Sequence, residues 1–170
     1  MKSVQFFVIC CVSLLGIFPV AASAQRFDIS TDGKEVTDQN TGLIWRRCAE
    51  GLAWDGVSSC TGTFFSGTHE QALSLAVSQA NLGRTLTPLT PWRLPNVKEL
   101  SSIVDTSLSS PATNAVFPSV PVNAGNSKFW SSTPYVYNSA NAWYVDFQDG
   151  YVGNTTRSST WFVRLVRSRL

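Results

Sequence analysis

Few side chains in this sequence are of the types that make or break covalent bonds. The chain has one histidine, His69, and four cysteines, at positions 10, 11, 48 and 60. His69 stands at the first position of an expected helix, where the helix dipole disfavours its charged form. No Gly-x-Ser-x-Gly motif accompanies it, so no catalytic triad can be assigned. We therefore name no catalytic residue and expect that the protein is not an enzyme.

The cellular compartment decides how the cysteines are interpreted, and residues 1–24 have the three parts of a secretory signal peptide. They contain an early lysine, a long apolar run and a small-x-small end at Ala22-Ser23-Ala24. A membrane anchor is the alternative, but the small residues favour cleavage after Ala24. We expect an exported product, in the periplasm, at the cell surface or outside the cell, with no membrane span after cleavage. Residues 25–170 would then form one domain.

Cys48 and Cys60 are the two cysteines that remain after such cleavage. They enclose 11 residues, and an even pair in an exported protein favours a disulfide. A reactive or metal-binding cysteine is the alternative, although two cysteines and one histidine do not complete a closed zinc site. We predict a Cys48–Cys60 disulfide, no metal site and no cofactor.

The composition is that of a globular domain. Hydrophobic residues make up 44% of the chain and charged residues 14%, with a net charge of +2. This balance excludes a disordered acidic or basic tail and a coiled coil. A dedicated nucleic-acid binder would be more basic. We expect no nucleic-acid partner.

Three residues in the last third of the chain are suited to binding a partner. Tyr135, Tyr137 and Asn141 lie between two expected strands, in a segment rich in serine and asparagine. Tyrosine with small polar residues is a composition typical of contact surfaces. We predict that these three residues contact a ligand.

Four arginines follow Asp149, the last acidic residue, and give the C-terminal segment a local charge of +4: Arg157, Arg164, Arg167 and Arg169. Guanidinium groups hold sulfate, phosphate or anionic glycans through paired hydrogen bonds. We select Arg157 and Arg164 as candidate ligand contacts. A solvated strand face followed by an ordinary tail is the alternative and stays open.

The six tryptophans are divided between core and surface. For five of them a core position is favoured over a role as a platform for a ligand: Trp45, Trp92, Trp130, Trp143 and Trp161. Trp54 lies inside the predicted disulfide loop. We expect it to be the exposed tryptophan and a further ligand contact.

Local signals place a hairpin and two helices in the first part of the chain. Residues 34–38 and 43–48 read as strands joined by the turn residues 39–42. Thr68 with Gln71 three positions later is a capping box, and Gly83 is placed to end that helix. Asn96 caps a second helix, with glutamate at its third position.

The rest of the chain is irregular and then rich in strands. Residues 105–127 have no sustained period and contain three prolines, which predicts a long irregular loop. Four later segments read as strands: 128–133, 142–147, 151–153 and 161–167. Large groups on both faces of the last strand favour a central place in its sheet. We predict an α+β fold, with two helices packed on a twisted antiparallel sheet in which the chain ends meet.

Five blocks, in order, resemble the motifs of one bacterial family: Val36–Trp45, Trp92–Leu100, Phe129–Thr133, Ala142–Phe147 and Val163–Arg167. It is the Lcl C-terminal domain family, named for the C-terminal domain of a bacterial collagen-like surface adhesin, and the resemblance runs from about Lys34 to Arg167. It implies a C-type-lectin-like fold, also similar to that of the formylglycine-generating enzymes. It further implies binding of sulfated polysaccharides by a trimer assembled through a collagen-like stalk. No Gly-X-Y tract precedes the domain here, so a homo-oligomer stays an open alternative.

Calcium and catalysis are both disfavoured by comparison with related folds. C-type lectins that bind sugars through Ca²⁺ use Glu-Pro-Asn or Gln-Pro-Asp together with Trp-Asn-Asp, and these tripeptides do not occur here. Asp146 and Asp149 could hold a cation, but a strand carboxylate beside a turn aspartate is the favoured interpretation. The enzymatic relatives need cysteines in the C-terminal half, and none follows Cys60.

Two hypotheses from different classes follow. The first is an adhesin-like, non-catalytic module that binds a glycan, sulfated or otherwise anionic, or an extracellular protein, without calcium. The second is a structural or accessory subunit of a bacterial surface appendage or secretion assembly.

Overall fold

The structure is a computed structural model that describes residues 25–79, 90–121 and 127–169. The predicted signal peptide and the predicted helix end at Gly83 lie outside the described residues. Within them, the fold is mixed α and β with two short helices, as predicted, but the strands form three sheets, one with a parallel pair, and not the single antiparallel sheet expected. None of the helices in this part of the chain has the length and apolarity needed to cross a membrane.

The first sheet joins the two ends of the described chain. Its order is β1-β2-β3-β11, with β1 at Phe27–Ile29, β2 at Glu35–Asp38, β3 at Leu43–Arg46 and β11 at Val166–Ser168. All its pairings are antiparallel. The predicted hairpin is confirmed as β2–β3, and the prediction that the chain ends meet in one sheet is also confirmed.

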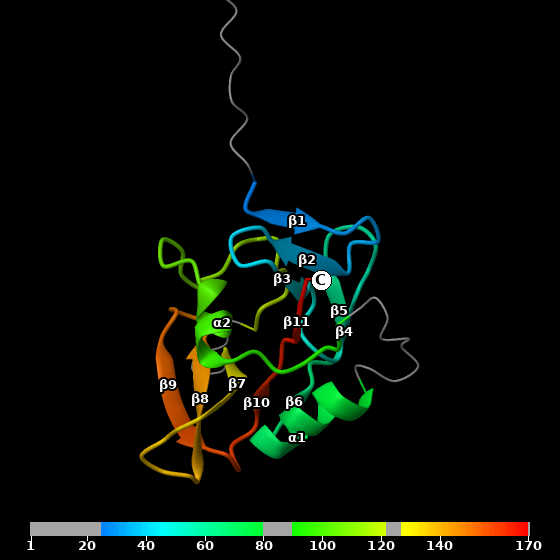
Figure 1. The fold of residues 1–170 in the computed structure, drawn as a ribbon. Helices are drawn as coiled ribbons and strands as arrows, with labels where there is room; N and C mark the ends of the chain where they lie inside the picture. Colours follow the sequence, from blue (N-terminus) through cyan, green and yellow to red (C-terminus); the bar gives the residue numbers. More distant parts are fainter. Residues whose placement is uncertain (1–24, 80–89, 122–126, 170) are drawn as a thin grey trace, which may run out of the picture.

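The second sheet has the order β6-β10-β7-β8-β9. Its strands are β6 (Ser66–Gly67), β10 (Trp161–Phe162), β7 (Lys128–Pro134), β8 (Asn141–Asp146) and β9 (Val152–Thr156). β7, β8 and β9 form an antiparallel meander, while β10 runs parallel to β7. In Figure 1 the first sheet occupies the upper part of the molecule and the second sheet the lower part.

A small hairpin, which was not predicted, begins within the disulfide loop and ends just beyond it. It pairs β4 (Leu52–Trp54) with β5 (Cys60–Gly62), and the side chain of Asp55 accepts hydrogen bonds from three backbone N–H groups of the turn. The predicted Cys48–Cys60 disulfide is confirmed, with the two Cα atoms 5.7 Å apart. It connects the hairpin to the chain just after β3.

Both predicted helix starts are confirmed. Thr68 caps α1 (His69–Ser74) with Gln71 as the reciprocal partner, and Asn96 caps α2 (Val97–Ser102) with Glu99 in the same role. A π-helical turn, η1 (Leu75–Gln79), continues α1. α1 packs on β6 and β7, and α2 packs on β7 and β8. Both helices therefore lie on the second sheet, with α2 on the side of β8 and α1 beside β6 in Figure 1.

The predicted strand 161–167 is wrong as a single element. It is two strands, β10 and β11, which belong to different sheets. Between them, Val163, Arg164 and Leu165 are buried and carry the chain from the second sheet to the first. The carbonyl of Leu165 accepts a hydrogen bond from the N–H of Arg46, at the end of β3, and the carbonyl of Val163 accepts one from the N–H of Glu50. These bonds take the place of a sheet ladder. The predicted central position holds for β10, which lies between β6 and β7.

Two clusters of buried side chains make the core. One joins both sheets, α2 and the long loop, and includes Trp45, Leu100, Phe117, Phe129 and Val145. The other lies around α1 and the crossing segment, and includes Ala72, Trp92, Trp130, Val163 and Leu165. Trp45, Trp92 and Trp130 are at most 3% exposed, so their predicted core positions are confirmed.

The disulfide should make a large contribution to stability, because it restricts the unfolded chain. Replacing both Cys48 and Cys60 by alanine should lower the free energy of unfolding by about 3 kcal/mol. Urea denaturation of the wild type and the double variant, followed by circular dichroism, measures the difference. The wild type with its disulfide reduced is the control and should resemble the double variant. A loss below about 1 kcal/mol would contradict the loop-closure explanation.

Candidate functional site

Four of the six predicted contact residues lie together at one end of the second sheet. We call Tyr135, Tyr137, Asn141 and Arg157, together with Trp143, the tyrosine–arginine surface. The backbone carbonyl of Asn141 joins it, accepting hydrogen bonds from the Tyr135 N–H (3.2 Å) and from Arg157 Nε (3.3 Å). The end of β7, the start of β8 and the segment after β9 therefore meet at one carbonyl.

Three aromatic rings adjoin one another on this surface. The Tyr135 ring centroid lies 5.5 Å from that of Tyr137 and 5.3 Å from that of Trp143, both in edge-to-face geometry. Tyr137 is 86% exposed, and Trp143 is half-buried. Trp143 is one of the five tryptophans predicted to be core residues. The structure places it at the surface end of β8, where that face of the sheet is only partly covered.

Arg157 is held mainly by its backbone. Its N–H donates to the carbonyl of Ala140 and its own carbonyl accepts from the N–H of His69, so it links β8 to the start of α1. No aspartate or glutamate of the described residues lies within ion-pair distance of its guanidinium. A half-buried cation without an acidic partner in this part of the chain can receive an anionic group.

Asn141 adds a buried polar atom to the same surface. Its side-chain nitrogen donates to Asn154 Oδ1 at 2.9 Å, while its Oδ1 is buried and accepts no hydrogen bond from the described residues. An acceptor in that state is unfavourable unless a donor reaches it. The surface therefore combines a cation, an acceptor and aromatic rings.

His69 has a structural position beside this surface. It is 2% exposed, donates from Nε2 to the carbonyl of Ser131 at 2.9 Å, and packs edge-on against the Trp130 ring. Burial lowers its pKa below the ordinary value, and the positive charge of Arg157 lowers it further. His69 is therefore neutral at neutral pH and is part of the core. A hollow of about 510 Å³ lies between α1 and Arg157.

Arg164 does not lie with the predicted contact residues. It is 1% exposed and donates to the carbonyls of Arg46 and Arg47. Burial lowers its pKa to about 10, and the charge of Glu50 opposes that shift, so the guanidinium stays charged at neutral pH. The selection of Arg164 as a ligand contact is corrected, because its side chain is buried in the interior, where Nη1 donates to two backbone carbonyls.

Trp54 lies apart from the tyrosine–arginine surface. It lines a groove of about 400 Å³ between the first sheet and the β4–β5 hairpin, together with Glu50 and Trp92. The prediction that Trp54 is the exposed tryptophan holds in part, because it is half-buried. The groove itself was not predicted, since its residues come from segments far apart in the sequence.

Asp146 and Asp149, which were considered as ligands of a cation, each accept a backbone hydrogen bond within a turn. Asp146 accepts a hydrogen bond from the N–H of Gln148, and Asp149 accepts one from the N–H of Tyr151. In residues 25–79, 90–121 and 127–169, no three or more His, Cys, Asp or Glu side chains are grouped as metal ligands. These contacts agree with the turn interpretation of Asp146 and Asp149.

Comparison with protein families gives one result that bears on this geometry. The model of the Lcl C-terminal domain matches residues 34–167, well over half of the chain. The match includes every residue of the tyrosine–arginine surface and every residue that lines the Trp54 groove except Asp32. Comparison with curated proteins gave no match.

The two arginines predicted to bind ligand should differ sharply in their effect on stability. Arg164→Met leaves two buried carbonyls without their donor and removes a favourable charge from Glu50, and should cost about 3–5 kcal/mol. Arg157→Met, which removes the same charge from a half-buried site, should cost about 1 kcal/mol or less. Urea unfolding of both variants measures this. Equal losses would contradict the interior role of Arg164.

His69 should make stability depend on pH between about 7 and 5. Its pKa is lowered in the folded state, so the unfolded chain binds the proton more readily and stability falls as the pH drops below about 6.5. Glu50, whose pKa burial raises, changes stability in the opposite sense. The urea midpoint is measured at both pH values. The difference between the two midpoints should be smaller in His69→Gln, which retains Glu50, than in the wild type. An unchanged shift in the variant would show that another group is responsible.

Proposed function

The chain belongs to the Lcl C-terminal domain family, and we propose that it is an exported, adhesin-like binding module without catalytic activity. Its ligand is an anionic glycan, held at the tyrosine–arginine surface without calcium. The C-type-lectin-like fold implied by the family resemblance belongs to the same proposal. Export follows from the predicted signal peptide and agrees with the disulfide.

The position of Arg157 carries this proposal. Its guanidinium has no carboxylate partner in the described residues. Its Nε donates to the Asn141 carbonyl, which also accepts a hydrogen bond from the Tyr135 N–H. A guanidinium binds sulfate or carboxylate groups through paired, charge-assisted hydrogen bonds. The adjoining aromatic rings offer apolar faces to the C–H groups of a sugar and polar hydroxyls at their edges. Together they match a sugar that carries an anionic substituent.

The state of the reactive side chains supports a non-catalytic role. His69 is buried and bonded to a backbone carbonyl, and Cys48 and Cys60 are joined to each other. General acid–base or nucleophilic catalysis needs such groups within reach of a substrate. Binding without calcium is supported by Asp146 and Asp149, whose carboxylates each accept a backbone hydrogen bond in a turn.

A structural subunit is the second candidate, and one observation favours it. Val136 is 82% exposed and Tyr137 is 86% exposed, side by side on the β7–β8 connection. Adjacent exposed apolar groups are typical of protein contacts. A stoichiometric partner that co-purifies with the wild type and not with Val136→Asp, combined with no glycan signal, would select this function instead.

Binding of a sulfated heparin oligosaccharide, measured by calorimetry, tests the first candidate. Arg157→Gln should weaken binding by about tenfold or more, which corresponds to about 1.4 kcal/mol or more. Arg169→Gln removes the same charge from an exposed arginine of the first sheet and should leave the affinity within about twofold. The desulfated, N-acetylated oligosaccharide should bind more weakly, and a chelator should have no effect.

Three outcomes would contradict this proposal. Equal losses for Arg157→Gln and Arg169→Gln would mean that net charge, and not a defined site, holds the oligosaccharide. Loss of binding on adding the chelator would require a cation. Turnover of the oligosaccharide would make the protein an enzyme.

A further inference from the structure

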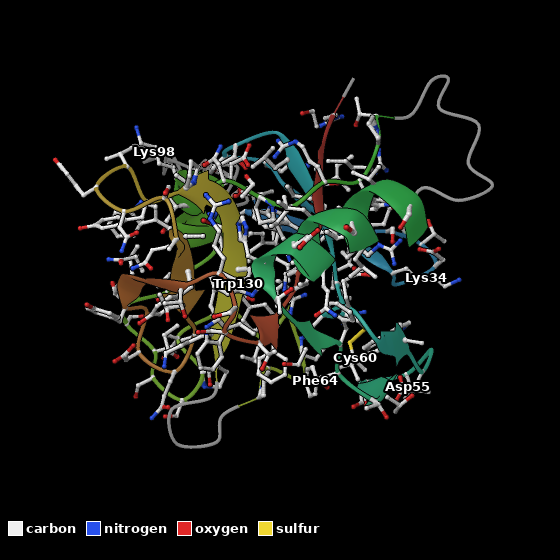
Figure 2. All side chains as sticks on the ribbon, turned by 90° about the horizontal axis from the view of Figure 1, so that it is seen from below. Lys34, Asp55, Cys60, Phe64, Lys98 and Trp130 are labelled. Carbon is white, nitrogen blue, oxygen red and sulfur yellow. A yellow bond between two sulfur atoms is a disulfide. The ribbon has the colours of Figure 1, made fainter. Side chains whose placement is uncertain are left out.

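The groove beside Trp54 is separate from the tyrosine–arginine surface. It shares no residue with that surface and lies against the first sheet and the β4–β5 hairpin. Figure 2 shows Lys34, which lines it, on the same side of the molecule as Asp55 and Cys60 of the hairpin, far from Lys98. Its volume of about 400 Å³ falls within the range of about 300–1,000 Å³ found for small-molecule pockets. It is large enough for a small ligand of its own.

The Trp54 ring is held in place by its neighbours. The guanidinium carbon of Arg47 lies 3.6 Å from the ring centroid, and Arg47 is itself fixed by donating to the carbonyls of Val116 and Gly33. Gly33 has a positive φ of 71°, and a Cβ at that position would lie 2.5 Å from Trp54 Nε1. A side chain at position 33 would displace the ring. The ring is therefore positioned in advance, which reduces the entropy lost when a ligand binds.

Two of the three carboxylates that line the groove are paired with arginines. Glu35 is paired with Arg167 at 2.6 Å, and Glu50 lies 3.5 Å from Arg46. Paired charges do not attract an ion strongly, but they present hydrogen-bond donors and acceptors next to each other. An uncharged ligand with many hydroxyl groups matches that pattern better than a sulfated one, which the two carboxylates would repel.

Glu50 is the acceptor that points to a ligand in this groove. Its side chain is 8% exposed, and its Oε1, which lies 3.5 Å from Arg46 Nε as an ion pair, accepts no hydrogen bond from the described residues. Burial raises its pKa, and the nearby charges of Arg46 and Arg164 oppose that shift. A buried carboxylate in this state gains from a hydroxyl donor, and Glu50 is one of the residues that line the groove.

We propose that this groove binds a pyranose ring of an uncharged sugar, which packs against Trp54 and donates a hydroxyl hydrogen bond to Glu50. The indole covers the C–H face of the sugar, and the paired charges of the groove receive its remaining hydroxyls. The site is independent of the anionic glycan proposed for the tyrosine–arginine surface. The domain would then recognise two chemical classes of sugar on two sides.

The experiment titrates the unaltered protein, labelled with ¹⁵N, with four uncharged trisaccharides: cellotriose, maltotriose, mannotriose and tri-N-acetylchitotriose. At least one should shift the Trp54 indole N–H signal in a saturable way, with the signal assigned from Trp54→Phe. Trp54→Ala and Glu50→Gln should each weaken binding by about tenfold. Tyr137→Ala, which alters only the other surface, should leave it unchanged.

Three results would overturn the inference. The first is that none of the four sugars shifts the Trp54 signal at millimolar concentration. The second is that a sulfated oligosaccharide shifts it while the uncharged sugars do not. The third is that Tyr137→Ala weakens trisaccharide binding as much as Trp54→Ala. Because the shift is measured on the unaltered protein, a variant that fails to fold does not prevent the test. Since the sugars are uncharged, the result is also distinguishable from failure of the Arg157 site.

Discussion

A single buried guanidinium connects the parts of this molecule. Arg164 donates to the carbonyls of Arg46 and Arg47 and lies over the rings of Phe117 and Phe129, at 5.0 and 5.9 Å from their centroids. It thereby joins the end of β3, the long loop and β7 around the segment that crosses between the sheets. A buried charge is costly unless it is hydrogen-bonded, so the two hydrogen bonds donated by Arg164 Nη1 favour this arrangement, although Nη2 finds no partner among the described residues.

The same short segment after β3 serves the core and the surface. The carbonyl of Arg47 accepts from Arg164, while the guanidinium of Arg47 lies over Trp54. Glu50 faces Arg164 on one side and lines the groove on the other. The segment that interacts with the buried Arg164 therefore also positions residues of the groove. The tyrosine–arginine surface has a different origin, because the Asn141 carbonyl and the β7–β8–β9 meander position it.

Local signals predicted much of the fold. The β2–β3 hairpin and both capping boxes depend on residues within a few positions of each other, and all of them are present. The alternating pattern of residues 161–167 gave the wrong prediction of a single strand. Such a pattern shows which faces of a strand are apolar, but not which sheet provides its partner strand. The prediction for Trp143 failed for a related reason. A core position was expected from the sequence, but the start of β8, where Trp143 lies, is at the surface.

The sequence by itself determined the helix starts, the first hairpin, the disulfide pair and the nearness of Tyr135 and Tyr137, since each rests on neighbours along the chain. The tertiary structure alone decided that Arg164 is internal, that Arg157 meets Asn141, and that Trp54 faces a groove with Glu50. Those outcomes depend on which backbone carbonyls and rings arrive from distant segments. An arginine has the same side chain in the core and at the surface, and only its partners decide between the two.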